Sequence, residues 1–180
     1  MLFRSDLINE ANDLAEKGIK ELIVIAQDTA QYGTDLYKSK KLAELIGKLD
    51  KIQGFEWIRL LYLHPAHLDK KIIDTIAASK KVLPYFEIPL QHINNSILDK
   101  MNRKITKKEI IGKIRYLREK IPNAIIRTTF IVGFPGESQK IFEELKEFVI
   151  QEKFERMGVF TYSPEDGTPA ATFPDKVDSE

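Results

Sequence analysis

The sequence predicts an α/β fold in which parallel strands form a curved sheet, a partial barrel, with helices outside. Continuous apolar runs alternate with segments of helical apolar spacing, and each strand and helix pair spans about thirty residues. Unbroken apolar runs are typical of parallel strands that are covered on both faces. Arg59, Glu87 and Arg127 fall at mid-strand positions. Because a buried charge needs a partner or water, these three favour a sheet curled around a polar concave side, with Glu87 paired to an arginine.

The composition is that of a globular protein and excludes several kinds of site. The 180 residues suit one domain or part of a larger one, with the proportion of apolar residues usual for a globular core. A net charge of +1 gives no whole-chain argument for a nucleic acid or membrane partner. There are no cysteines, which excludes disulfides and iron or zinc ligation by thiolates of this chain. No apolar run is typical of a secretory signal or a membrane span, so we expect a cytoplasmic protein.

The first third of the chain predicts two strands, each preceded by a helix. Ser5 can cap a helix that ends at Gly18, because the apolar positions between them follow helical spacing. A strand follows at 21–27. The next helix is predicted at 41–52 and the next strand at 57–63.

The middle third continues the alternation. An aspartate can cap the helix at 70–79, and a strand-like run follows at 85–90. Two helical pieces come next, at 94–102 and 106–121. The second opens with the Thr-x-x-Glu spacing of a capping box.

The last third predicts a strand at 125–132, a serine-capped helix at 139–152 and a strand at 157–162. The remaining residues are rich in proline and turn formers. We therefore predict a core domain at 1–165 and an exit loop or start of a linker at 166–180.

Polar side chains recur where the apolar runs stop. Ligands of such folds bind at the carboxyl ends of the strands, although turn chemistry alone also concentrates polar residues there. The strand ends carry Gln27, Asp28 and Thr29, then His64, then Gln91 and His92, then the turn Gly133 to Glu137, and finally Tyr162.

A divalent metal is one reading of these strand ends. Asp28, His64 and His92, with Glu137, offer oxygen and imidazole ligands, as a metal-dependent hydrolase or lyase would need. His64 and His67 have an i, i+3 spacing, but the intervening Pro65 argues against one helix that presents both. No nucleophile elbow or phosphate-binding lysine loop is present. A non-catalytic binding module is a further alternative.

The strand ends, taken in order, resemble a known family. The segments "ELIVIAQDTAQYGTDLY", "WIRLLYLHP", "YFEIPLQH", "MNRKITKKE", "IRTTFIVGFPGES" and "GVFTYSPEDGTPAA" are similar in order and spacing to the radical S-adenosylmethionine methylthiotransferases. The resemblance covers nearly the whole chain. The sequences "AQDT" and "PLQH" are more similar to the branch of the family that modifies a ribosomal protein than to the branch that modifies tRNA. The tRNA branch stays as the alternative within the family.

The resemblance implies an open barrel of the radical SAM type that binds S-adenosylmethionine and a 4Fe-4S cluster. In that family, sulfur is inserted at an unreactive C–H bond and then methylated. The substrate of the ribosomal branch is an aspartate of a small-subunit ribosomal protein. The cluster motif C-x-x-x-C-x-x-C is absent here. We therefore expect a piece of such an enzyme that lacks the first strand and the cluster loop, is inactive alone, and can self-associate through the sheet edge so exposed.

The resemblance also implies roles for the strand-end residues. Asp28 would take the ammonium group of the cofactor, Arg127 its carboxylate, and Gln91 would lie near its ribose, while Gly133 would let the backbone approach. Without the cluster we expect weak cofactor affinity. The implied cofactor-binding residues are Gln27, Asp28, Glu87, Gln91, Arg127, Thr129 and Gly133, and the implied substrate-binding residues are Tyr32, His64, His92 and Tyr162.

Overall fold

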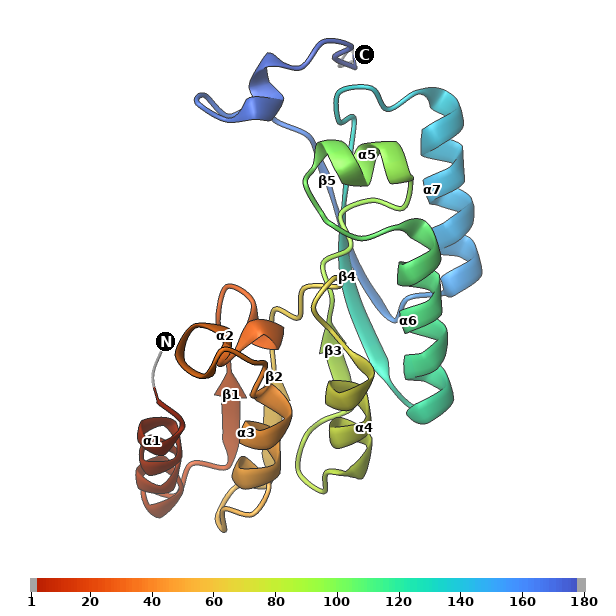
Figure 1. Cartoon of the computed structure of the whole chain (residues 1–180). Coiled ribbons are helices and arrows are strands. Elements are labelled where there is room, and N and C mark those ends of the chain that lie inside the picture. The colour runs from red at the N-terminus through yellow and green to blue at the C-terminus, as the bar shows by residue number, and fades with distance from the viewer. Residues whose placement is uncertain (1–2, 178–180) are drawn as a thin grey trace.

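Strands and helices alternate along the chain, as the sequence predicts (Figure 1). The computed structural model describes residues 3–177. The elements within this range are α1 (Arg4–Glu16), β1 (Glu21–Val24), the 3-10 turn η1 (Thr29–Gln31), α2 (Thr34–Tyr37), α3 (Leu42–Leu49), β2 (Trp57–Leu60), α4 (Lys70–Ala78), β3 (Tyr85–Glu87), α5 (Asn95–Lys100), α6 (Lys107–Lys120), β4 (Ile125–Val132), α7 (Gln139–Glu152), β5 (Arg156–Thr161) and η2 (Pro169–Thr172).

All strand pairs are parallel, as predicted. β1 pairs with β2, and β4 lies between β3 and β5. The prediction of one continuous sheet is wrong in one respect, because the ladder breaks between β2 and β3. There the backbone of Ile58 bonds that of Lys81 and Leu83, and the Leu63 N–H donates to the Glu87 carbonyl at 2.9 Å. The strands therefore follow chain order as two adjoining parallel sheets, with no closed barrel among the described residues.

Helices cover one side of the strands. α3 packs against α1 and α4, and α4 packs in turn against α6; Figure 1 shows α4, α6 and α7 beside β3 to β5. Alternation along β4 explains the layering, because Ile126, Thr128 and Phe130 are buried and the residues between them are more exposed. The Phe130 ring meets the Phe148 ring of α7 at 6.4 Å between centroids. This face is the core, and the opposite face is open.

The predicted helix caps are confirmed except the first. Asp69 and Ser138 accept bonds from the backbone amides three residues on, and the capping box at the start of α6 is complete. Ser5 does not cap α1. It lies inside the helix, whose N-cap position is Phe3. The Arg4 amide donates instead to the Tyr37 hydroxyl at 2.8 Å, which gives one of the unpaired helix-start amides a tertiary partner.

The charged residues of the open face are paired. Arg127 Nε lies 3.8 Å from Glu87 Oε1, which confirms the predicted ion pair. Arg59 pairs instead with Glu21 at 2.5 Å, a partner that the sequence analysis did not identify. The Arg127 side chain is 54% exposed, so this pair faces water and contributes little to stability.

The residues after β5 fold back toward the turn that follows β4. The Phe173 ring contacts the Phe134 ring at 6.2 Å, and the Gly136 amide donates to the Asp175 carbonyl at 2.9 Å. The predicted boundary between 165 and 166 stays a prediction. Among residues 3–177, every helix is too short or too polar to cross a membrane.

Candidate functional site

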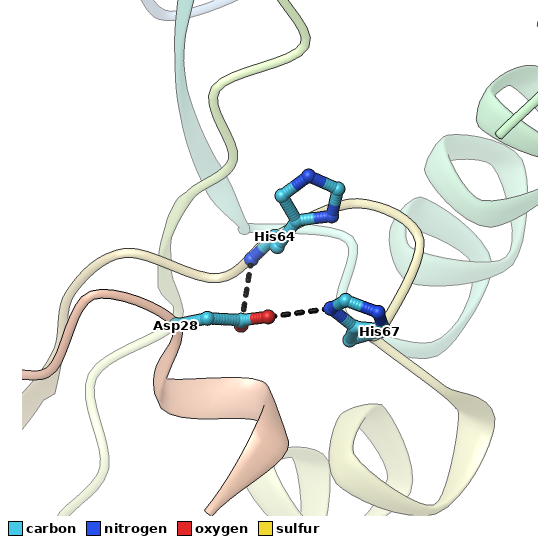
Figure 2. A group of neighbouring side chains, drawn as sticks. All are labelled: Asp28, His64 and His67. Carbon is cyan, nitrogen blue, oxygen red and sulfur yellow. Dashed lines mark hydrogen bonds and ion pairs between the residues drawn. The ribbon is translucent and has the colours of Figure 1, made fainter. Parts of the chain in front are cut away.

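Asp28 lies four residues after β1, at the N-cap position of η1, and joins the loops that follow β1 and β2. Its Oδ1 accepts bonds from the amides of Ala30 (3.2 Å) and His64 (3.3 Å). Its Oδ2 lies 2.5 Å from His67 Nδ1 and 3.2 Å from Gln31 Nε2. Figure 2 shows the Asp28 carboxylate facing the single loop that carries both His64 and His67. Because both oxygens are engaged, the predicted binding of a cofactor ammonium by Asp28 loses support.

His64 and His67 lie side by side, with 4.9 Å between ring centroids. The His67 amide donates to the His64 carbonyl at 3.0 Å, so a tight turn through Pro65, not a helix, brings the rings together. Pro65 does exclude a helix here, as the sequence predicted, but the turn brings the two rings together without one. Burial, and then the charge of Arg103, lower the pKa of His64 to about 4, which keeps its imidazole neutral near pH 7.

The turn after β4 is braced from inside by Glu137, which is 8% exposed. The carboxylate of Glu137 accepts bonds from the amides of Gly133 and Phe134 and lies 3.5 Å from His92 Nε2. Gly133 has φ +73°, which a glycine adopts without strain, and a Cβ there would meet no atom within 4 Å. Gly133 is thus required by backbone conformation; its predicted approach to a cofactor stays a prediction.

His92 belongs to the same brace. Its side chain is fully buried, and its Nδ1 accepts a bond from the Asn94 amide at 2.9 Å, so Nε2 carries the hydrogen that points to Glu137. This geometry argues against the predicted substrate contact, and it separates His92 and Glu137 from the metal-ligating group predicted with Asp28 and His64. Those two lie with His67 instead.

Gln91 and Tyr162 flank the end of β4. The Gln91 amide donates to the Thr129 carbonyl at 2.8 Å, and the Tyr162 amide donates to the Val132 carbonyl at 2.8 Å. Gln91 has φ +72°, an uncommon value for a residue with a side chain and one often found at functional sites. Its Oε1 and the Tyr162 hydroxyl are buried without a hydrogen-bond partner in the part of the chain that the structure describes. Unpaired buried polar atoms are costly, and a bound polar ligand would relieve that cost.

Arg103, in the loop after α5, was missed by the sequence analysis. Its Nη2 donates to the carbonyl of Pro89, two residues before Gln91, at 2.5 Å. Its Nε is buried and unpaired, and no carboxylate between residues 3 and 177 lies within ion-pair distance. Burial lowers the pKa of this guanidinium, and the charge of Asp28 opposes that effect. The only sequence signal for Arg103 was its place in the segment "MNRKI". An arginine in a loop leaves the apolar spacing of helices and strands unchanged, so that spacing could not reveal it.

The remaining predicted residues are scattered. Gln27 is exposed, and Thr129 on β4 lies in register with Gly158. The Tyr85 hydroxyl, and then the charge of Glu87, raise the pKa of Arg127. Tyr32 is 6% exposed and belongs to the core, and its pKa is raised to about 12, first by burial. The predicted substrate contact of Tyr32 stays a prediction.

Among the described residues, three buried polar groups that each have an atom without a partner thus lie in segments next to β3 to β5: the Arg103 guanidinium, which contacts the loop after β3, the Gln91 amide oxygen and the Tyr162 hydroxyl. Such a set suits a ligand that carries both a carboxylate and hydroxyl groups. Arg127, Thr129 and Glu87 lie on the neighbouring open face of the same strands.

Comparison with known protein families assigns the chain to a class. The family model described as "Radical SAM superfamily" matches residues 4–149. The chain belongs to the radical SAM superfamily.

Curated relatives narrow the comparison. The "Ribosomal protein uS12 methylthiotransferase RimO" of Clostridium perfringens is 52% identical over 174 residues, which is 97% of this chain and 39% of that protein. The protein of the same name from Aquifex aeolicus is 50% identical over 175 residues, which is 97% of this chain and 40% of that protein. The chain therefore spans about two fifths of the length of these relatives.

Solved structures agree on the fold. The radical S-adenosylmethionine methyltransferase TsrM from Kitasatospora setae superposes with a TM-score of 0.70 at 16% identity, over 94% of this chain and 33% of that one. Coproporphyrinogen III oxidase HemN from Escherichia coli gives a TM-score of 0.65 at 18% identity, over 93% of this chain and 39% of that one. At these identities the likeness concerns the fold alone.

Proposed function

We propose that this chain is the central part of a cytoplasmic radical S-adenosylmethionine methylthiotransferase that modifies an aspartate of ribosomal protein uS12. The observation that supports this most is the identity of about one residue in two, over nearly the whole chain, to proteins of that name. The tRNA branch has less support, because the relatives reported above are of the ribosomal kind.

The cofactor S-adenosylmethionine fits the residues at the strand ends. It carries a carboxylate, which suits the unpaired guanidinium of Arg103, and ribose hydroxyls, which suit the unpaired oxygens of Gln91 and Tyr162. We assign the carboxylate to Arg103 in place of Arg127, because Arg127 pairs with Glu87 and is half-exposed. Thr129 borders Gln91 and stays in the proposed site.

A 4Fe-4S cluster does not fit this chain, which has no cysteine to supply thiolates. When S-adenosylmethionine is bound beside a reduced cluster, it supplies the radical that activates a C–H bond. The residues of this chain would bind and orient the cofactor. The cluster ligands would come from other parts of a longer protein.

A chimera tests the proposal. The matching 174 residues of the Clostridium perfringens relative would be replaced by this chain, and uS12 modified by the chimera would be examined by mass spectrometry. We expect the mass increase of one methylthio group on an aspartate, as with the unaltered relative. A chimera that folds and holds its cluster, yet leaves uS12 unmodified, would contradict the proposed function.

A further inference from the structure

We propose that Asp28, His64 and His67 form a binding site for one divalent first-row transition-metal ion. The three side chains come from the loops after β1 and β2, and one ligand atom from each lies within 4.8 Å of the other two (Figure 2). All three are partly buried, so an ion can enter from solvent. Its donors are a carboxylate and two imidazoles with no thiolate, so it is a different kind of site from an iron–sulfur cluster, and the proposal does not depend on the proposed function.

The donor set selects the class of ion. One carboxylate oxygen with two imidazole nitrogens suits Zn²⁺, Co²⁺ or Ni²⁺, whereas Ca²⁺ and Mg²⁺ prefer oxygen ligands only. Metal–ligand bonds of roughly 2.0–2.2 Å bring ligand atoms to about 3.3 Å from one another in a tetrahedron. His67 Nδ1 and Asp28 Oδ2 are already 2.5 Å apart. Small shifts of the loops would therefore admit an ion between the side chains.

The structure pre-orients the ligands. Asp28 is anchored by the amides of Ala30 and His64, which fix the direction of its carboxylate. His64 Nδ1 accepts only a 3.2 Å bond from the Ala66 amide, so this nitrogen is unprotonated and has a lone pair. A bound ion would replace the Ala66 N–H as the partner of His64 Nδ1, and it would replace the proton shared between His67 Nδ1 and Asp28 Oδ2. Three protein ligands leave a fourth position open to water, and the nearby charge of Arg103 weakens binding relative to closed structural sites.

The composition of the chain makes the test simple. It has three histidines and no cysteine, and the third histidine, His92, is fully buried. The untagged 180-residue chain would be titrated with Zn²⁺ by calorimetry and with Co²⁺ by visible absorption. We expect one ion per chain, and a rise in Kd of roughly tenfold or more in His64→Ala and in His67→Ala. Asp28→Asn should weaken binding in the same way. Its matched control is Asp74→Asn, which makes the same change at an exposed position on α4 and should bind like the parent.

A second measurement needs no variant. In the unaltered chain, Co²⁺ should shift the NMR signals of the His64 and His67 rings far more than those of His92. Failure to bind one Zn²⁺, binding that survives both histidine substitutions, or equal shifts at all three rings would overturn the proposal. Thermal unfolding of each variant separates loss of a ligand from loss of the fold.

Discussion

Replacing Glu137 with glutamine removes the negative charge that braces the turn after β4. The amide keeps the size of the side chain, but its NH₂ group cannot accept the backbone N–H bonds of Gly133 and Phe134. Hydrogen bonds to a charged group contribute about 1.5–3 kcal/mol each, and the bonds to Phe134 and His92 are long. Since the remaining amide oxygen retains part of the network, we expect Glu137→Gln to lower the free energy of unfolding by about 2–3 kcal/mol.

Urea unfolding of the purified chain measures this loss, and thermal unfolding should show a midpoint lower by roughly 5–10 °C for a domain of this size. Glu147→Gln is the matched control, because it makes the same chemical change at an exposed position on α7. Its unfolding free energy should stay within about 0.5 kcal/mol of the parent. If the two variants prove equally stable, the buried carboxylate does not brace the turn and the reasoning is refuted.

Three further predictions follow from other contacts. Burial opposes ionisation of Asp50, but bonds from the Ser79 hydroxyl and the amides of Lys81 and Lys80 outweigh it and lower its pKa. The stabilisation from Asp50 is then complete above its unfolded pKa near 4 and is lost as the pH falls through its lower folded value. By urea unfolding, Asp50→Asn should therefore destabilise at pH 7, and the loss should shrink as the pH falls below about 4; a loss that does not change with pH would speak against the assignment. Glu87→Gln should cost less than about 1 kcal/mol, because its arginine partner is exposed, and a larger loss would show a stronger pair. Among the described residues, β1 has one unpaired edge, and Ile23 on β1 and Ile25 just after it are exposed, so this edge should allow self-association of the chain. Light scattering would detect it as a mass that rises with concentration, and Ile23→Lys should reduce that rise; a constant monomer mass would exclude self-association.

Much of the fold could be predicted from local patterns. The strand β4 and the capped helices α4, α6 and α7 agree with the predicted ranges because apolar period and capping are local properties. The start of α1 was wrong because its first amide finds a tertiary partner, Tyr37, that no local pattern reveals. The break between β2 and β3 is likewise a matter of strand register, which depends on contacts between segments distant in sequence.

The candidate site was harder to predict for the same reason. The sequence placed Asp28, His64 and Gln91 correctly after successive strands, since the end of an apolar run is a local signal. However, β1, β2 and β3 end at Val24, Leu60 and Glu87, earlier than predicted. It could not say that Asp28 is engaged by His67, or that His92 is buried against Glu137. Both facts arise from loops that meet only in the folded chain. Arg103 was missed because its burial follows from the packing of the α5 to α6 loop against Pro89.

The affinity of the chimera for S-adenosylmethionine tests the central claim most directly. Calorimetry would compare Arg103→Ala with Arg115→Ala, a matched control in which an exposed arginine of α6 is removed. If Arg103 binds the cofactor carboxylate, its removal should weaken binding roughly 10- to 100-fold, as expected for loss of hydrogen bonds between charged groups, while the control binds like the parent. Equal affinity of the two variants would contradict the placement of the cofactor at the ends of β3 to β5.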